Sequence, residues 1–170
     1  IGGKPLLRSD ARTGDFIVLT GEIGGAAAGY LILKNKLESN GFKHFLNALN
    51  RPKIDYELCK RIAEKANAGI DVSDGLAFEL GEMARLSRKK IVLEWEKLPV
   101  SRKLHGFCET HGFNEEELAL HSGEDYQIAF STPSAKHGIV VGRVSSGRGL
   151  FLNKEGKVRK LEPRGFEHFK

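Results

Sequence analysis

The sequence is poor in cysteine and has no long hydrophobic run. Its two cysteines, Cys59 and Cys108, are far apart and form no metal-like pair, so a reduced, cytoplasmic setting fits best. No apolar run approaches the ~18–20 residues of a membrane span, and no signal peptide is recognised. The six histidines are dispersed, and none is paired at the helical spacing of zinc ligands. Membrane proteins and zinc proteins are therefore disfavoured.

The sequence also lacks an initiating methionine, which is compatible with a piece of a longer protein. Its 170 residues, 40% of them hydrophobic, suffice for one sizeable core and predict a single domain over 1–170. The net charge of +5 is compatible with nucleic acid or anionic metabolites. However, the basic residues are scattered apart from short clusters at 85–90 and 158–164, and no basic-aromatic motif accompanies them. Nucleic acid is therefore not an expected partner.

The most informative stretch is IDVSDGLAFELGEM at 70–83. A short alternating segment precedes Asp71, and from Leu76 the apolar residues recur at helical spacing, so Asp71 and Asp74 are expected at a strand-to-helix turn. There the helix offers free N–H groups and the positive end of its dipole. Two carboxylates at such a turn can hold Mg²⁺ together with phosphate. Alternatively, Ser73 or Asp74 only caps the helix, and the spacing leaves both interpretations open.

A second informative stretch is SGEDYQI at 122–128. Gly123 predicts a turn, and residues 126–131 predict a strand. Glu124 and Asp125 then lie at the strand entrance, where acidic groups rarely help a sheet but can face a ligand. A solvated acidic turn is the other interpretation, and spacing does not decide between them.

A glycine-rich turn at 21–25 follows an apolar strand at 16–20 and precedes a helix to about Glu38. Such a turn can approach phosphate closely. This one lacks the Lys-Ser/Thr end of a P-loop and the full GxGxxG spacing. Close packing of small residues between helix and sheet is therefore the favoured interpretation.

The remaining segments mix strands and helices without regular βαβ alternation. The patterns predict a turn-rich connection at 40–52, a helix capped by Asp55 to about 66, strands at 91–95 and 138–144, helices at 102–111 and after Asn114, and a hairpin at 150–161. These elements predict an α+β fold with one mixed, mostly antiparallel sheet and helices packed on its faces.

Taken together, the motifs resemble a known family. LLRSDARTGD (6–15) followed by FIVLTGEIGGAAAG, then IDVSDGLAFEL, SGEDYQI and the terminal GFEHF, resemble the C-terminal half of thiamine-monophosphate kinases. That family lies in the superfamily of aminoimidazole-ribonucleotide synthetase-like (PurM-like) enzymes. The resemblance implies a Mg²⁺-dependent, direct transfer of the ATP γ-phosphoryl group to thiamine monophosphate, giving thiamine diphosphate, and such chemistry depends on positioning and charge neutralisation.

The resemblance assigns roles to six residues. They are the catalytic metal ligands Asp71 and Asp74, the nucleotide contacts Arg8 and Ser73, and the substrate contacts Glu124 and Phe166. The chain departs from the family at Gly24-Gly25-Ala26, where Gly-Asp-Ser is usual.

The family's N-terminal domain has no counterpart in this sequence. That domain supplies further metal-binding aspartates, much of the nucleotide site and the main dimer contact. The resemblance therefore implies that the full-length protein is a homodimer and that this chain alone is inactive. Two alternatives stay open: another ATP-dependent enzyme of the superfamily (aminoimidazole-ribonucleotide, selenophosphate or hydrogenase-maturation type), or a non-catalytic ligand-binding or nucleic-acid-binding module.

Overall fold

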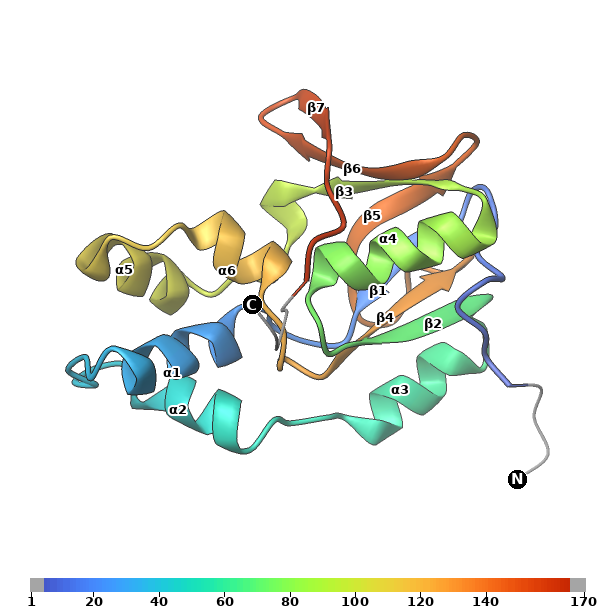
Figure 1. Cartoon of the computed structure of the whole chain (residues 1–170). Coiled ribbons are helices and arrows are strands. Elements are labelled where there is room, and N and C mark those ends of the chain that lie inside the picture. The colour runs from blue at the N-terminus through green and yellow to red at the C-terminus, as the bar shows by residue number, and fades with distance from the viewer. Residues whose placement is uncertain (1–4, 166–170) are drawn as a thin grey trace.

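The computed structural model describes residues 5–165 and contains a seven-stranded sheet of order β2-β4-β1-β5-β3-β6-β7 (Figure 1). The strands are β1 (Phe16–Leu19), β2 (Ala68–Val72), β3 (Lys90–Glu94), β4 (Gln127–Thr132), β5 (Ile139–Ser145), β6 (Gly149–Lys154) and β7 (Lys157–Lys160). Neighbouring strands are antiparallel except for the parallel pair β3 and β6. This confirms the predicted mixed, mostly antiparallel sheet.

In the described part of the chain, helices form three of the six connections between successive strands, and all three precede β4. They are α1 (Gly25–Lys34), α2 (Lys43–Asn50), α3 (Tyr56–Ala63), α4 (Leu76–Ser87), the 3-10 helix η1 (Trp95–Lys97), α5 (Arg102–His111) and α6 (Glu115–His121). Within residues 5–165, no helix has both the length and the apolar character needed to span a membrane.

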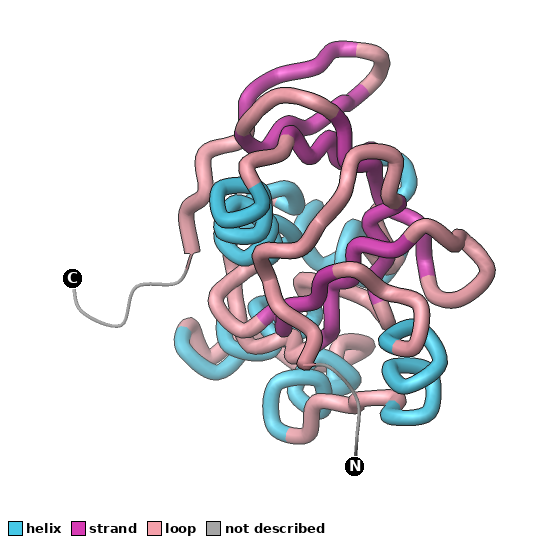
Figure 2. The backbone as a smooth tube through the Cα atoms, turned by 90° about the vertical axis from the view of Figure 1, so that its right-hand side faces the viewer, coloured by secondary structure: helices cyan, strands magenta, loops and turns pink. Residues whose placement is uncertain are grey.

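Two of these helices cover opposite faces of the sheet. Successive strand residues point to opposite faces, and in β1 Ile17 packs into the core under α4, whereas Val18 packs against Ile62 of α3. Leu80 and Met83 of α4 are fully buried in that larger core. Figure 2 shows helices on both sides of the strands.

The other four helices, α1, α2, α5 and α6, form a second core beyond one end of the strands (Figure 1). Its centre is aromatic: the ring centroids of Phe45 and Phe107 are 5.6 Å apart in an edge-to-face arrangement. The junction between this helical group and the sheet is formed by the turns after β1 and before β4.

Helix α2 corrects the prediction of a turn-rich connection at 40–52. Its formation depends on tertiary packing, because the backbone of Phe45 lies directly against Gly29 of α1, where an added Cβ would be 2.3 Å from the Phe45 carbonyl oxygen. By contrast, the predicted caps are confirmed: Asp55 Oδ1 accepts from Leu58 N at 2.8 Å, and Asn114 Oδ1 accepts from Glu117 N at 3.2 Å.

Candidate functional site

The two aspartates lie at the predicted strand-to-helix transition: Asp71 is the residue before the last of β2, and Asp74 lies between β2 and α4. We call residues 71–75 the aspartate turn. Asp71 is exposed and Asp74 is half-buried. Among the described residues, neither carboxylate accepts a hydrogen bond or forms an ion pair. Both are therefore available to a group from outside this chain.

The interpretation of Ser73 or Asp74 as a helix cap is wrong. The residue at the cap position of α4 is Gly75, with φ 119°, and no side chain makes a capping hydrogen bond there. Instead, Ser73 Oγ donates to Glu79 Oε1 at 3.3 Å. The positive φ explains why glycine follows Asp74.

Glu79 is a buried carboxylate beside the aspartate turn, and the sequence pattern did not single it out. It lies in the first turn of α4, is 5% exposed, and also accepts from the backbone N–H of Asp74. Burial raises the pKa of Glu79; the Asp74 N–H opposes this shift, whereas the Asp71 and Asp74 charges add to it. An acidic residue in a first helical turn is ordinary, so spacing alone gave no reason to assign it a role. In the structure it holds the turn in place.

The acidic loop, residues 122–126, lies directly against the aspartate turn. Glu124 N donates to Ser73 O at 2.8 Å, and Tyr126 N donates to Val72 O at 3.0 Å. An added Cβ on Gly123 would be 2.1 Å from Ser73 O, so only glycine allows this approach. The structure therefore brings together two motifs that are about fifty residues apart in the sequence.

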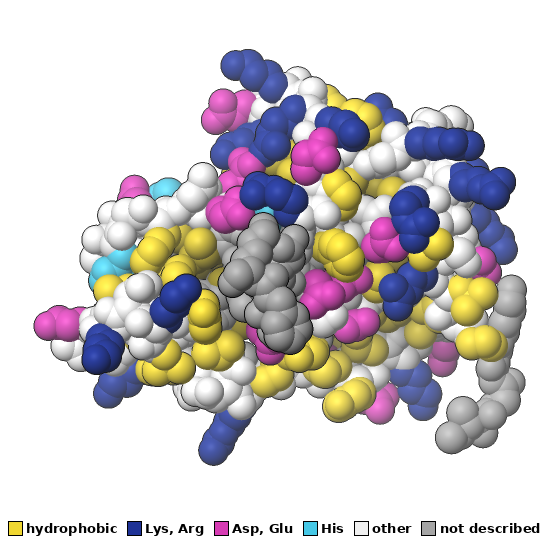
Figure 3. Space-filling view, viewed as in Figure 1, with side chains coloured by type: hydrophobic (Ala, Val, Ile, Leu, Met, Phe, Trp, Pro, Cys, Tyr) yellow, Lys and Arg dark blue, Asp and Glu magenta, His cyan; other side chains and the backbone are white. Residues whose placement is uncertain are grey.

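Tyr126 belongs to this site and not to the strand that was predicted to begin with it. Its φ of 50° places it outside β4, which begins at Gln127. The pKa of Tyr126 is raised chiefly by the charge of Glu124, and further by Asp71 and Asp74. The phenol of Tyr126 thus lies within reach of the charges of three carboxylates. Figure 3 shows acidic side chains gathered over the turn between β2 and α4.

Asp125 is buried, and its carboxylate is hydrogen-bonded to the start of α1. It is 7% exposed, and its carboxylate oxygens accept from Gly24 N at 2.7 Å and from Ala26 N at 3.2 Å. These N–H groups begin α1, so the glycine-rich turn has its free donors occupied by a carboxylate of the same chain. Burial raises the pKa of Asp125 to about 7, against the opposing effect of the backbone N–H groups.

Because the pKa of Asp125 is raised, the free energy of unfolding should depend on pH, and this dependence should be weaker in Asp125→Asn. Between pH 4 and 7 the unfolded chain loses this proton while the folded chain retains it, so wild-type stability falls as pH rises. We expect this contribution to be on the order of 3 kcal/mol and to be absent from the variant. Urea unfolding of both proteins from pH 4 to 8 measures the difference, and parallel stability curves would contradict the assignment.

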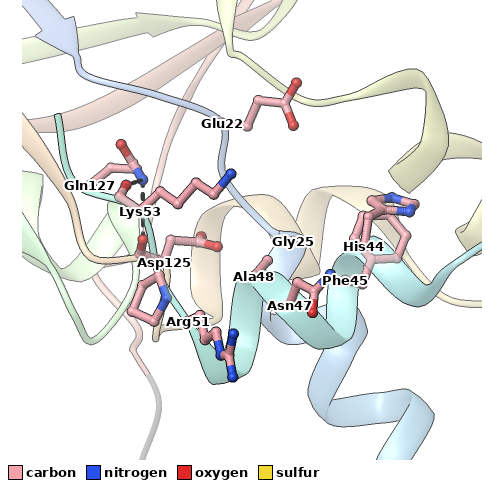
Figure 4. Close-up of a pocket in the computed structure, with 11 residues that line it drawn as sticks. Glu22, Gly25, His44, Phe45, Asn47, Ala48, Arg51, Lys53, Asp125 and Gln127 are labelled. Atoms are coloured by element: carbon pink, nitrogen blue, oxygen red, sulfur yellow. Dashed lines mark hydrogen bonds between the residues drawn. The ribbon is translucent and has the colours of Figure 1, made fainter.

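Two cavities flank the acidic loop. The first, of about 340 Å³, has Glu124 at its edge and mainly apolar walls from α1 and its neighbours, including Ala27, Tyr30 and Leu118. The second, of about 520 Å³, has Lys53, Asp125 and Gln127 together on one side and residues of α2 on the other, including His44 and Phe45 (Figure 4). The loop thus separates an apolar space from a polar one.

Two other predicted site residues are not brought to the aspartate turn by any described contact. The carbonyl oxygen of Arg8 accepts from Ser87 Oγ at 3.4 Å, at the opposite end of α4. Its charge is also one of the smaller influences that lower the pKa of Glu82, after the hydrogen bond from Arg85. Phe166 lies outside the described residues. It follows Gly165, whose added Cβ would be 2.7 Å from the Asp74 carbonyl oxygen.

Comparison with known proteins identifies relatives along nearly the whole chain. The model of the family described as AIR synthase related protein, C-terminal domain, matches residues 12–161. The thiamine-monophosphate kinase of Aquifex aeolicus is 38% identical over 95% of this chain and 54% of its own length. That of Pyrococcus horikoshii is 34% identical over 99% of this chain and 55% of its own length. The chain thus spans about half the length of the curated relatives it matches.

Solved structures agree with these matches. The structure of AaThiL complexed with AMPPCP and TMP superposes with a TM-score of 0.83 at 37% identity, covering 96% of this chain and 54% of that one. The thiamine-monophosphate kinase from Stenotrophomonas maltophilia K279a gives 0.80 at 26% identity, over 92% and 56% of the two chains. The hydrogenase maturation protein HypE of Escherichia coli, at 18% identity and 0.68, shares the fold. The chain therefore belongs to the family of AIR synthase related protein C-terminal domains, and the resemblance to thiamine-monophosphate kinases drawn from its motifs is confirmed.

Proposed function

We propose that this chain is the C-terminal half of a kinase that transfers the γ-phosphoryl group of ATP directly to thiamine monophosphate, giving thiamine diphosphate. The observation that carries the proposal is the junction of the aspartate turn with the acidic loop through the hydrogen bond from Glu124 N to Ser73 O. It joins the turn that carries the two aspartates to a loop whose residues Gly123 and Glu124 line a cavity of about 340 Å³. The relatives named thiamine-monophosphate kinase, and the complex with AMPPCP, an ATP analogue, support this substrate pair.

The aspartate turn fits Mg²⁺ held together with nucleotide phosphates. Mg²⁺ is usually bound by one or two carboxylates, with water and phosphate oxygens completing its octahedron. Asp71 and Asp74 provide two such carboxylates, and the described residues contain no group of three metal-ligating side chains. Asp71 and Asp74 would hold the ion, Ser73 would contact a phosphate, and Arg8 would contact ATP. The ion supplies charge neutralisation during phosphoryl transfer.

The apolar cavity beside Glu124 fits the acceptor. Thiamine monophosphate carries a cationic thiazolium and an aminopyrimidine ring, so its organic part suits apolar walls with one carboxylate at the edge. Glu124 lies at the edge of this cavity, and Tyr30 of α1 lies on another wall. Phe166 is proposed as a further contact with the thiamine rings. Together these groups would hold the acceptor phosphate toward the aspartate turn, and alignment of donor and acceptor is the main requirement of this reaction.

The isolated chain is predicted to have no kinase turnover. Two carboxylates cannot bind and orient a nucleotide alone, and we propose that an N-terminal domain supplies the other ligands and the dimer contact. This division of the site between two domains is tested by assaying thiamine diphosphate formation by the isolated chain and by the full-length gene product side by side. Substantial turnover by the isolated chain would contradict it.

A cytoplasmic location stays a prediction; Cys59 and Cys108 are both free thiols.

The acceptor is tested by a panel of substrates given to the full-length gene product. Thiamine monophosphate, aminoimidazole ribonucleotide precursors and selenide are compared by kcat/KM in the presence of ATP and Mg²⁺. We expect thiamine monophosphate to exceed the others by at least ~100-fold, since a site built for one acceptor discriminates through unpaired polar groups. If the protein binds ATP but forms no thiamine diphosphate, the thiamine-monophosphate kinase proposal is wrong, and another ATP-dependent activity of the superfamily takes its place.

A further inference from the structure

Asp125 supplies the cap that α1 cannot provide for itself. The residue at the cap position of α1 is Gly24, with φ 81° and no side-chain hydrogen bond. An added Cβ there would be 2.6 Å from Leu104, so no capping side chain fits. The carboxylate of Asp125, 101 residues away in the sequence, accepts from Gly24 N instead. A buried carboxylate at a helix N-terminus satisfies free donors and complements the dipole.

The acidic loop is therefore anchored at two helix N-termini. On one side the Asp125 side chain binds the start of α1 through Gly24 and Ala26. On the other side the backbone N–H groups of Glu124 and Tyr126 bind the chain just before α4. The loop spans the gap between the sheet with α4 and the helical group that contains α1.

The conformation of this loop requires such anchors. Glu124 and Tyr126 both have positive φ, 71° and 50°, although neither is glycine. Left-handed backbone is unfavourable for such residues and persists where surrounding contacts hold it. Asp125 lies between these two residues and is the buried anchor of the segment. Loss of its carboxylate would allow the backbone to relax and Glu124 to move.

We propose that Asp125 is a positioning residue that fixes Glu124 relative to α1, and thereby sets the width and polarity of the acceptor cavity. The cavity has Glu124 on one wall and Ala26, Ala27 and Tyr30 of α1 on the other, so the Asp125 contact with α1 joins the two walls. The assignment of the cavity to the acceptor rests on the proposed function. The anchoring of the acidic loop to α1 by Asp125 does not depend on that assignment, because it rests on the hydrogen bonds to Gly24 N and Ala26 N.

The test compares Asp125→Ala and Asp125→Asn with Asp55→Ala in the full-length gene product. Asp55 is a matched control because it also caps a helix, α3, through a side-chain oxygen, but is exposed and lines neither cavity beside the acidic loop. We expect Asp125→Ala to raise the KM for thiamine monophosphate at least tenfold, with the KM for ATP changed less than threefold. Asp125→Asn, which retains one acceptor oxygen, should recover part of this loss. Asp55→Ala should lower the Tm without changing either KM.

A purely structural role would give a different pattern. If Asp125→Ala and Asp55→Ala both lower the Tm and leave the acceptor KM unchanged, the proposal is overturned. If Asp125→Ala does not fold, Asp125→Asn decides: an acceptor KM raised at least threefold supports the proposal, and an unchanged one overturns it.

Amide hydrogen exchange makes the test independent of the substrate. We expect the amides of Glu124 and Tyr126 to exchange at least tenfold faster in Asp125→Asn than in wild type, and to be unchanged in Asp55→Ala. Unchanged exchange rates in Asp125→Asn would overturn the proposal that Asp125 holds Glu124 in position. If no thiamine diphosphate forms with wild-type protein, the proposed function fails. The exchange rates still test whether Asp125 holds Glu124 in position.

Discussion

Asp71→Asn is expected to lower turnover of the full-length gene product by at least ~100-fold, equivalent to about 3 kcal/mol of transition-state stabilisation. The amide cannot supply the negative charge that a Mg²⁺ ligand provides, and Asp71 is exposed at the end of β2 with no protein partner among the described residues to lose. Stability should therefore change little. Initial rates at several Mg²⁺ concentrations, together with the Tm, measure both effects.

The matched control for this variant is Asp55→Asn. Asparagine is as good a helix cap as aspartate, and Asp55 lies at the start of α3, where it caps only that helix. Its turnover should equal that of wild type. Wild-type turnover in Asp71→Asn at every Mg²⁺ concentration would remove the aspartate turn from the reaction.

Gly123→Ala is expected to lower the free energy of unfolding by about 2–4 kcal/mol and to abolish most turnover. The added methyl group would lie 2.1 Å from Ser73 O and 3.1 Å from Asp74 Cα, both of them backbone atoms that cannot rotate away. The acidic loop must then separate from the aspartate turn, breaking the hydrogen bond from Glu124 N to Ser73 O. Urea unfolding and initial rates test both consequences.

Gly106→Ala is the corresponding control. Gly106 is in the interior of α5, and an added Cβ there would meet no atom within 4 Å. Alanine should stabilise this helix by about 0.5–1 kcal/mol and leave turnover unchanged. If both alanine variants have wild-type stability, the close approach of the two motifs is refuted.

Local pattern was sufficient for the aspartate turn. The change from strand-like alternation to helical spacing at Leu76 placed the two aspartates at a strand-to-helix turn. In the structure Asp71 is one of the last two residues of β2, and Asp74 lies between β2 and α4. Turn chemistry similarly placed Glu124 just before β4. Such features depend on neighbours in the sequence, which is why a single chain reveals them.

The roles of Glu79 and Asp125 could not be predicted in the same way. Asp125 is adjacent to Glu124 in the sequence, yet its partners lie 101 and 99 residues away and turn its side chain into the protein. Glu79 looks like an ordinary acidic residue of a first helical turn until its contact with Ser73 is seen. Helix α2 was missed for the same reason, since its packing on Gly29 is tertiary.

The central claim is direct phosphoryl transfer at the junction of these two motifs. Its most direct test is incubation of the full-length gene product with Mg²⁺, thiamine monophosphate and ATP labelled in the γ-phosphoryl group. We predict that the label appears in thiamine diphosphate in a 1:1 ratio to the ADP formed. Label found only in free phosphate, or bound covalently to the protein, would contradict the account.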